Sequence, residues 1–169
     1  LLIGKYTVVV ISLVLFILGA ISAPYLPFIQ NESSQQSQFV PTEAFITSVV
    51  DGDTVVLEDG SRVRYLGLDT PETFGEPECG GEKATSYNRM LVEGKKAELY
   101  AGPENQDQWG RLLRYVFVDG VFVNAELLYA GMAKAQSFHP DEKYRQIFTQ
   151  LAWSSQQLNR GLWSECNWE

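Results

Sequence analysis

The sequence predicts an α+β fold: a small closed β-barrel of five strands with about three α-helices. Five segments have the β-branched and aromatic composition of short strands, and Asp-Gly pairs stand between the first three. Three helix-like segments are inserted after the third strand. The 169 residues suffice for one domain with a proper core, and an apolar fraction of 45% suits a globular fold.

The predicted strands come in two groups. The first three span residues 45–50, 54–57 and 62–68, and tight turns at Asp51-Gly52 and Asp59-Gly60 join them. Two further strands complete the barrel, at residues 97–100 and 112–118.

Each predicted helix ends close to a glycine, which favours helix termination. The three helices are residues 82–92 before Gly94, residues 124–130 before Gly131, and residues 141–159 between Pro140 and Gly161.

Residues 1–24 are predicted to be a signal peptide or an N-terminal membrane anchor, in the form of a hydrophobic helix. Lys5 precedes an uncharged apolar run that ends near Ala23 and is close to the minimum length of a transmembrane helix. Pro24 disfavours cleavage directly after Ala23, so both alternatives stay open. Either one exports the protein, as a secreted or a membrane-anchored domain outside the cytoplasm.

Residues 25–40 are a predicted polar linker, because the run NESSQQSQ within them has no apolar residue. The folded domain is then expected to span residues 41–169. No internal repeat is present.

The segment from Asp51 to Thr73 carries the candidate metal ligands. Asp53 and Asp69 would supply hard oxygen ligands. Calcium accepts carboxylates, backbone carbonyls and waters in a flexible shell, so these two aspartates and the carbonyl of Thr70 predict an open calcium site.

The same segment carries candidates for catalysis of phosphodiester cleavage. Glu72 follows Asp69 by three residues and is placed to take a proton from an attacking water. Arg64, and Arg111 on the turn Trp109-Gly110-Arg111, would each grip phosphate oxygens through paired N–H groups and stabilise transition-state charge. Structural alternatives remain open: residues 69–72 as an ordinary turn or helix cap, and both arginines as surface strand residues.

A resemblance strengthens the catalytic interpretation. Separated motifs occur in one order: Val50 through Val55, Arg64 through Thr73 (RYLGLDTPET), Trp109-Gly110-Arg111, Asp119-Gly120, Val123-Asn124, Gly131 through Lys134, and Leu162 through Glu165. They cover about residues 45–165 and resemble the staphylococcal nuclease (thermonuclease) family. The resemblance implies an OB-fold barrel with helices, and a nuclease, expected to be an endonuclease, that cleaves DNA and RNA with calcium.

The resemblance also implies a role for each residue that matches the family's catalytic motif. These roles are metal binding for Asp53, Asp69 and the Thr70 carbonyl, general base for Glu72, phosphate binding for Arg64 and Arg111, and an acid near the metal for Asp51.

The chain departs from the family in the residues that bind substrate. A lysine-tyrosine pair of the family is Gln108-Trp109 here, so the aromatic face is kept and the cation is lost. Paired tyrosines are replaced by residues 136–139, among which Phe138 is the remaining aromatic. Trp109 and Phe138 are therefore the predicted substrate-stacking residues, and base preference stays open.

The net charge of −8 is unusual for a protein that binds nucleic acid. Residues 1–40 hold only Lys5 and Glu32, so the whole excess lies in the predicted domain. A bound cation and nearby arginines are expected to offset it at the site: Arg62, Arg64, Arg89, Arg111 and Arg114.

The two cysteines, Cys79 and Cys166, are predicted to form a disulfide because export favours oxidation. The alternative is a pair of free thiols. Two cysteines without a histidine nearby in the sequence do not predict a zinc site.

Two other functions remain open on the sequence: a non-catalytic OB-fold module that binds nucleic acid, and an exported calcium-binding domain. The expected partners are DNA and/or RNA as substrate, and the membrane if the N-terminal segment is retained. No protein partner is evident, and a monomer is expected.

Overall fold

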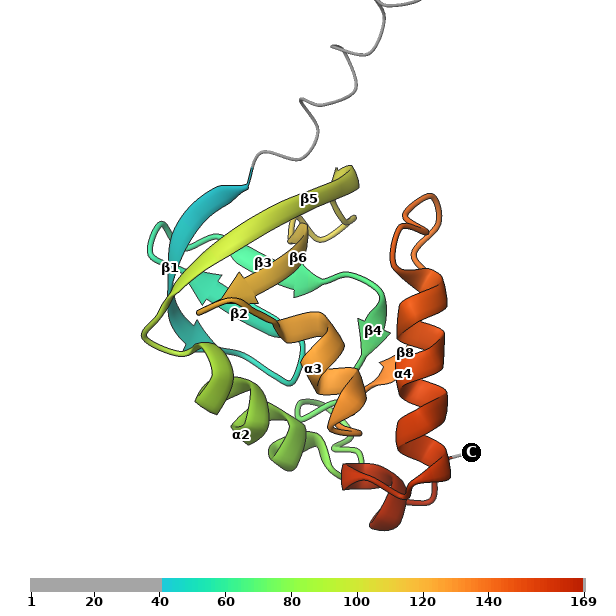
Figure 1. Cartoon of the computed structure of the whole chain (residues 1–169). Coiled ribbons are helices and arrows are strands. Elements are labelled where there is room, and N and C mark those ends of the chain that lie inside the picture. Colours follow the sequence, from blue (N-terminus) through green and yellow to red (C-terminus); the bar gives the residue numbers. More distant parts are fainter. Residues whose placement is uncertain (1–40, 169) are drawn as a thin grey trace, which may run out of the picture. The chain divides into compact units, whose positions relative to one another are not determined.

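The computed structural model describes residues 41–168 (Figure 1). The predicted hydrophobic helix at residues 1–24 and the polar linker at residues 25–40 lie outside the described residues. Within residues 41–168, no helix is both long enough and apolar enough to cross a membrane.

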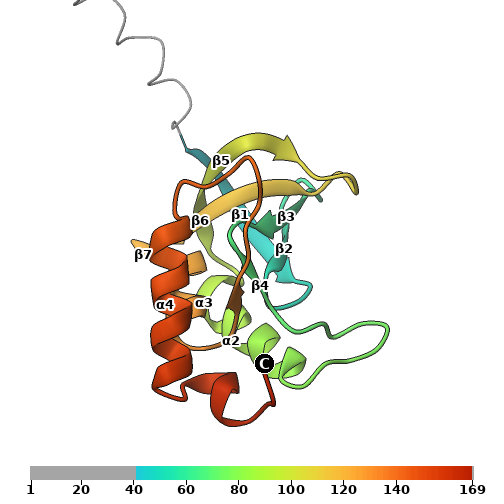
Figure 2. The same ribbon diagram turned by 90° about the vertical axis from the view of Figure 1, so that its right-hand side faces the viewer.

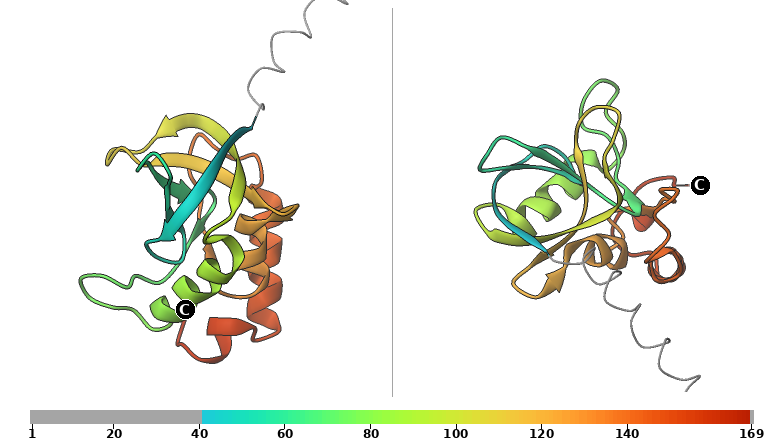
Figure 3. Two further views of the ribbon diagram at one scale, coloured as in Figure 1. Left: turned by 90° about the vertical axis from the view of Figure 1, so that its left-hand side faces the viewer. Right: turned by 90° about the horizontal axis from the view of Figure 1, so that it is seen from above.

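Five strands form a closed barrel, as the sequence predicts. Their order in the sheet is β3-β2-β1-β5-β6, and a parallel pairing of β3 with β6 closes the ring. The strands are β1 (Thr42–Val49), β2 (Thr54–Leu57), β3 (Arg62–Tyr65), β5 (Lys96–Gln106) and β6 (Leu112–Val118). The view from above in Figure 3 shows this ring, with one helix lying across its end.

Three short strands extend the barrel. β7 (Val121–Phe122) pairs with β6, while β4 (Leu68–Asp69) pairs with β8 (Lys134–Ala135) in a separate two-stranded sheet. In this small sheet Asp69 pairs with Lys134, which ties a predicted metal ligand to a segment far along the chain.

The third predicted strand, residues 62–68, was too long, because the chain turns between β3 and β4. Gly67 there has a positive φ of 82°, and a Cβ at this position would overlap the Phe148 ring. The turn therefore needs a glycine both for its backbone and for the approach of the helix that carries Phe148.

Within residues 41–168 three α-helices cover the barrel, which confirms the predicted number for the folded domain. They are α2 (Gly81–Val92), α3 (Val123–Tyr129) and α4 (Arg145–Gln157), followed by the 3₁₀ helix η2 (Gly161–Ser164). α2 lies across one end of the barrel (Figure 3), and α4 stands along its side next to α3 (Figure 2).

The predicted helix at residues 141–159 was too long at its start. Asp141 is buried in a loop, where its Oδ1 accepts a hydrogen bond of 2.6 Å from the Tyr115 hydroxyl. This contact, and a β-bridge between Phe138 and Asp141, hold the chain out of helical conformation before α4 begins.

The core lies inside the barrel and under α3 and α4. Val55, Val63 and Val116 are fully buried inside the sheet, and Leu127 and Phe148 seal it from the helices. β3 therefore turns Val63 inward, and Arg62 and Arg64 lie on its opposite face, where Arg62 is exposed and Arg64 is buried.

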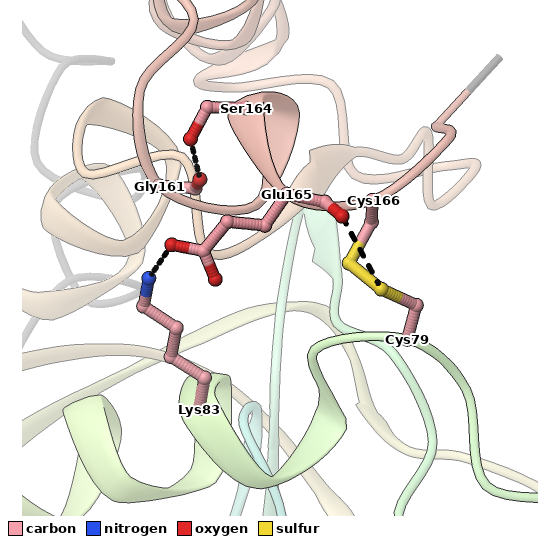
Figure 4. The surroundings of a disulfide bond; sticks show 6 residues. All are labelled: Cys79, Lys83, Gly161, Ser164, Glu165 and Cys166. Atoms are coloured by element: carbon pink, nitrogen blue, oxygen red, sulfur yellow. Dashed lines mark hydrogen bonds and ion pairs between the residues drawn. A yellow bond between two sulfur atoms is a disulfide. The ribbon is translucent and has the colours of Figure 1, made fainter.

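A disulfide joins Cys79 to Cys166 across 87 residues of sequence (Figure 4). It connects the loop between β4 and α2 to the segment after η2. An ion pair between Lys83 of α2 and Glu165 lies beside it. This is the pairing that the sequence predicts, and no free cysteine remains among the described residues.

Replacing both cysteines by serine is expected to lower the free energy of unfolding by about 2–5 kcal/mol, because the crosslink restricts a long loop of the unfolded chain. Urea unfolding of the variant and of the wild-type protein measures this difference. A reductant should destabilise the wild-type protein similarly and leave the variant unchanged. Two alkylatable thiols in the oxidised wild-type protein, found by mass spectrometry, would contradict the pairing.

Candidate active site

The structure brings Asp53 and Thr70 together at one end of the barrel. Asp53 directly precedes β2 and is only 4% exposed. Its Oδ2 accepts hydrogen bonds of 2.9 Å from both the backbone N–H and the hydroxyl of Thr70, and its Oδ1 accepts one from the Thr54 hydroxyl. The predicted ligand side chain and the predicted carbonyl ligand are thus held by the same hydrogen bonds.

Gly52 makes this arrangement possible by leaving space. A Cβ on Gly52 would lie 2.6 Å from the Thr70 hydroxyl oxygen, so any larger residue would displace Thr70. Asp51-Gly52 does join two antiparallel strands, but Gly52 has no positive φ. The glycine is therefore needed for close packing at the site rather than for a left-handed turn.

Arg64 lies between the two candidate metal-binding carboxylates. Its Nη1 contacts the Asp53 carboxylate, and its Nη2 donates a hydrogen bond of 2.6 Å to Oδ1 of Asp69. The arginine is 6% exposed, whereas the Asp69 side chain is half exposed. One guanidinium spanning both carboxylates shows that Asp53 and Asp69 approach each other closely.

The donor set fits a hard cation with a partly open shell. Within residues 41–168 no three His, Cys, Asp or Glu side chains cluster as a metal site. Two carboxylates, one backbone carbonyl and water form the type of shell that calcium accepts. A cation on Asp53 and Asp69 would compete with the Arg64 guanidinium for the same oxygen lone pairs.

The acidic side chains around this point affect one another's protonation. Burial raises the pKa of Asp51 to about 6, and the Asp53 charge adds to the effect. Partial burial also raises the pKa of Glu72, with further contributions from Asp53 and Asp69. Partial burial raises the pKa of Asp69 despite its contact with Arg64. Negative charge is in excess here, as expected of a site that binds a cation.

Asp51 supports the site through the backbone. Its Oδ1 accepts a hydrogen bond of 3.0 Å from the Asp53 N–H, and Asn88 of α2 donates one of 3.2 Å to its carbonyl. The buried Tyr65 hydroxyl in turn donates to Asn88. Asn88 was not predicted to support the site. The signal that could have indicated its burial is its helical spacing from Ala84 and Val92, which are both buried.

Glu72 lies in an exposed loop that projects beside α2 (Figure 3, left). The loop is closed on itself, because the Glu72 N–H donates to the Glu78 carboxylate at 3.1 Å and the Glu78 N–H donates to the Glu72 carbonyl at 2.9 Å. The disulfide at Cys79 anchors the next residue. The candidate general base is therefore carried on a constrained loop.

Glu72 and Arg111 line the same open depression, of about 400 Å³, together with Arg62 and Trp109. The Arg111 side chain is oriented by Asp107, whose Oδ2 accepts a hydrogen bond of 2.6 Å from the arginine Nε. Nothing in the sequence indicated this role for Asp107, because an aspartate four residues before Arg111 resembles an ordinary turn residue. The candidate base and one candidate phosphate ligand thus face a common space.

The two predicted stacking residues lie at different places. Trp109 is 72% exposed, and its ring centroid lies 5.1 Å from Cζ of Arg111. Phe138 is half-buried, with its ring centroid 5.7 Å from Cζ of Arg64. Trp109 presents an aromatic face to the open depression, whereas Phe138 packs over the buried arginine. Their substrate contacts stay predictions.

Comparisons with known proteins point to one family. Residues 62–165 match the family described as staphylococcal nuclease homologue. The chain is 30% identical over 126 residues to a thermonuclease of Staphylococcus hyicus, covering 70% of this chain and 74% of that protein. It is 31% identical over 125 residues to a thermonuclease of Staphylococcus intermedius, with 70% and 74% covered. It is also 37% identical over 124 residues to endonuclease YncB of Bacillus subtilis, with 69% and 59% covered.

Proposed function

The chain belongs to the staphylococcal nuclease family, and we propose that it is a calcium-dependent nuclease that hydrolyses phosphodiester bonds of DNA, RNA or both. Relatives named thermonuclease and endonuclease support a hydrolytic nuclease acting on nucleic acid. The observation that carries the proposal is the position of Arg64, which lies against both Asp53 and Asp69. The proposed metal-binding oxygens and the proposed phosphate-binding guanidinium are thereby side by side.

The residues have separate tasks in this proposal. Asp53, Asp69 and the Thr70 carbonyl hold the calcium ion, which when bound supplies Lewis-acid polarisation of a phosphoryl oxygen. Glu72 orients a water and takes its proton as the water oxygen attacks phosphorus. The phosphorus–oxygen bond to the leaving sugar oxygen breaks, and that oxygen takes up a proton from solvent. Its raised pKa makes the Glu72 carboxylate a stronger base than an ordinary surface glutamate.

The two arginines act on the phosphate. In the structure Arg64 donates to Asp69 and contacts Asp53. With those carboxylates committed to a cation, its N–H groups become available to phosphate oxygens. Arg111 approaches from the depression that Glu72 also lines, oriented by Asp107. Two planar guanidiniums then stabilise the charge that grows on the phosphoryl oxygens.

We also propose that the domain acts outside the cytoplasm as a monomer, secreted or anchored by its N-terminal segment. The Cys79–Cys166 disulfide supports this location, because structural disulfides persist in oxidising compartments.

Hydrolysis of DNA in the presence of calcium tests the proposed function. Activity is expected to disappear with a calcium chelator and to return with added calcium. Magnesium should support little turnover, because it requires a smaller and stricter octahedral shell. Release of acid-soluble nucleotides measures turnover, and circular dichroism checks that the chelator leaves the fold intact. Full activity in excess chelator would rule out the metal assignment.

A further inference from the structure

Arg62 lies beside the candidate active site, at the start of β3. Across the parallel pair of β3 and β6, Val63 is opposite Leu112, so Arg62 and Arg111 occupy neighbouring positions one residue earlier on each strand. Both arginines line the open depression, together with Glu72 and Trp109. The barrel closure therefore places a second guanidinium beside the one predicted to bind phosphate.

Arg62 differs from the other arginines in having no partner among residues 41–168. Six arginines are held by acids, amides, carbonyls or rings: Arg64 by Asp53 and Asp69, Arg89 by Glu93, Arg111 by Asp107, Arg114 by Asn105, Arg145 by Glu142, and Arg160 by Tyr129. Within residues 41–168, no hydrogen bond, ion pair or ring contact reaches the exposed Arg62 side chain.

This free charge is notable because the protein has an acidic excess of −8. Acidic side chains neutralise most of the other exposed arginines, yet none does so at Arg62. A guanidinium presents five N–H donors in a planar fork that matches phosphate oxygens. The Arg62 guanidinium, which lines an open depression without an acidic partner among the described residues, can therefore bind an anion that enters from solution.

Trp109 adds a second element to the same wall. Its indole ring is largely exposed, and the Arg111 guanidinium covers one side of it. The two residues before Trp109, Asp107 and Gln108, carry no positive charge, so Arg111 is the cation that this turn contributes. A base stacked on this ring would bring the phosphate of its own nucleotide to the depression, where Arg62 supplies a second positive charge beside Arg111.

We propose that Arg62 and Trp109 form a subsite for the nucleotide next to the scissile phosphate. Arg62 binds the flanking phosphate and Trp109 stacks on its base. This inference rests on the proposed nuclease function and extends it to substrate positioning. Arg62 contributes to binding of a polymeric strand and not to the chemical step, which Glu72, Arg64 and Arg111 carry out.

The variant Arg62→Gln tests the proposal, with Arg145→Gln as matched control, since Arg145 is an exposed arginine on α4 paired with Glu142. On a single-stranded oligonucleotide, Arg62→Gln should raise KM about three- to tenfold and leave kcat within about twofold. The dependence of log affinity on log salt should become shallower by about 0.7, the contribution of one phosphate contact to a single strand. Arg62→Lys should recover part of the affinity, because it restores the charge without the fork.

A short substrate with a single phosphodiester provides the second arm, because it lacks the flanking phosphate. Its KM should be the same for Arg62→Gln, Arg145→Gln and the wild-type protein. An unchanged KM on the oligonucleotide would overturn the proposal. A fall in kcat at constant KM would also overturn it, since Arg62 would then act at the scissile phosphate.

Binding without turnover separates this inference from the proposed function. Fluorescence anisotropy of a labelled single-stranded oligonucleotide with calcium can be measured in the Glu72→Gln background. Arg62→Gln should weaken that binding by the same factor as it raises KM. If the wild-type protein cleaves nothing, the nuclease proposal fails. If the Glu72→Gln protein binds the oligonucleotide equally well with and without Arg62→Gln, the Arg62 subsite alone is refuted.

Discussion

Glu72→Gln is expected to lower kcat by about 10²-fold or more, with calcium and substrate binding nearly unchanged. Glutamine keeps the size of the side chain and much of its hydrogen bonding but cannot take a proton from water. The loop that carries Glu72 is held by hydrogen bonds between the Glu72 backbone and Glu78. The substitution changes only the Glu72 side chain, so we expect the fold to be kept. A loss of kcat without a loss of stability would therefore report on proton transfer.

Steady-state kinetics on single-stranded DNA with saturating calcium measures the effect, and calcium titration measures metal affinity. Glu76→Gln is the matched control, since Glu76 is an exposed glutamate of the same loop. That control should have wild-type kcat and KM. If Glu72→Gln also had wild-type kcat, Glu72 would leave the mechanism, and the metal itself would have to generate the hydroxide.

Arg64→Lys and Arg111→Lys are each expected to lower kcat by about 10²- to 10³-fold. Lysine keeps the positive charge but loses the planar pair of donors that fits two phosphate oxygens. At position 64 a single ammonium also cannot reproduce the span from Asp53 to Asp69. At position 111 the hydrogen bond from the side chain to Asp107 would be lost as well.

Arg145→Lys is the control for these substitutions, because Arg145 is exposed on α4 and pairs with Glu142. It should leave kcat unchanged. Because Arg64 is buried, thermal unfolding of Arg64→Lys must accompany the kinetics, so that loss of catalysis is distinguished from loss of fold. Either lysine variant with wild-type kcat, once shown to be folded, would remove that arginine from transition-state stabilisation.

The barrel could be predicted from the sequence, because its strands carry strong composition and turn signals. β2 has the predicted bounds, and β6 does too. The break after β3 could not be predicted, since the Phe148 ring that approaches Gly67 comes from a helix about eighty residues later. The start of α4 was likewise decided by a tertiary contact, the hydrogen bond from Tyr115 to Asp141.

The candidate site was predictable where its residues are close in sequence, and less so where packing joins distant segments. Asp53 and Thr70 meet through hydrogen bonds, and Arg64 links Asp53 to Asp69, all within one segment of the sequence. Asn88 acts through its hydrogen bond to Asp51, and Asp107 acts by accepting one from Arg111. Asparagine in a helix and aspartate in a turn are both common, so the sequence alone did not indicate these supporting roles. Arg62 has no acidic partner among the described residues because the neighbouring acidic side chains do not reach it. This depends on the three-dimensional arrangement and cannot be read from the order of residues in the sequence.

The parallel pairing of β3 with β6 has a thermodynamic consequence. It joins Val63 to Leu112, and thereby brings Arg64 and Arg111 to the same end of the barrel. A molecule in which this seam has opened keeps both arginines but no longer presents them together. An anion that needs both of them binds only molecules with the seam closed, so mass action makes such a ligand a stabiliser of the fold. By the same linkage, local separation of β3 from β6 should become rarer as ligand occupancy rises. A bound substrate therefore stabilises the closed form of the barrel.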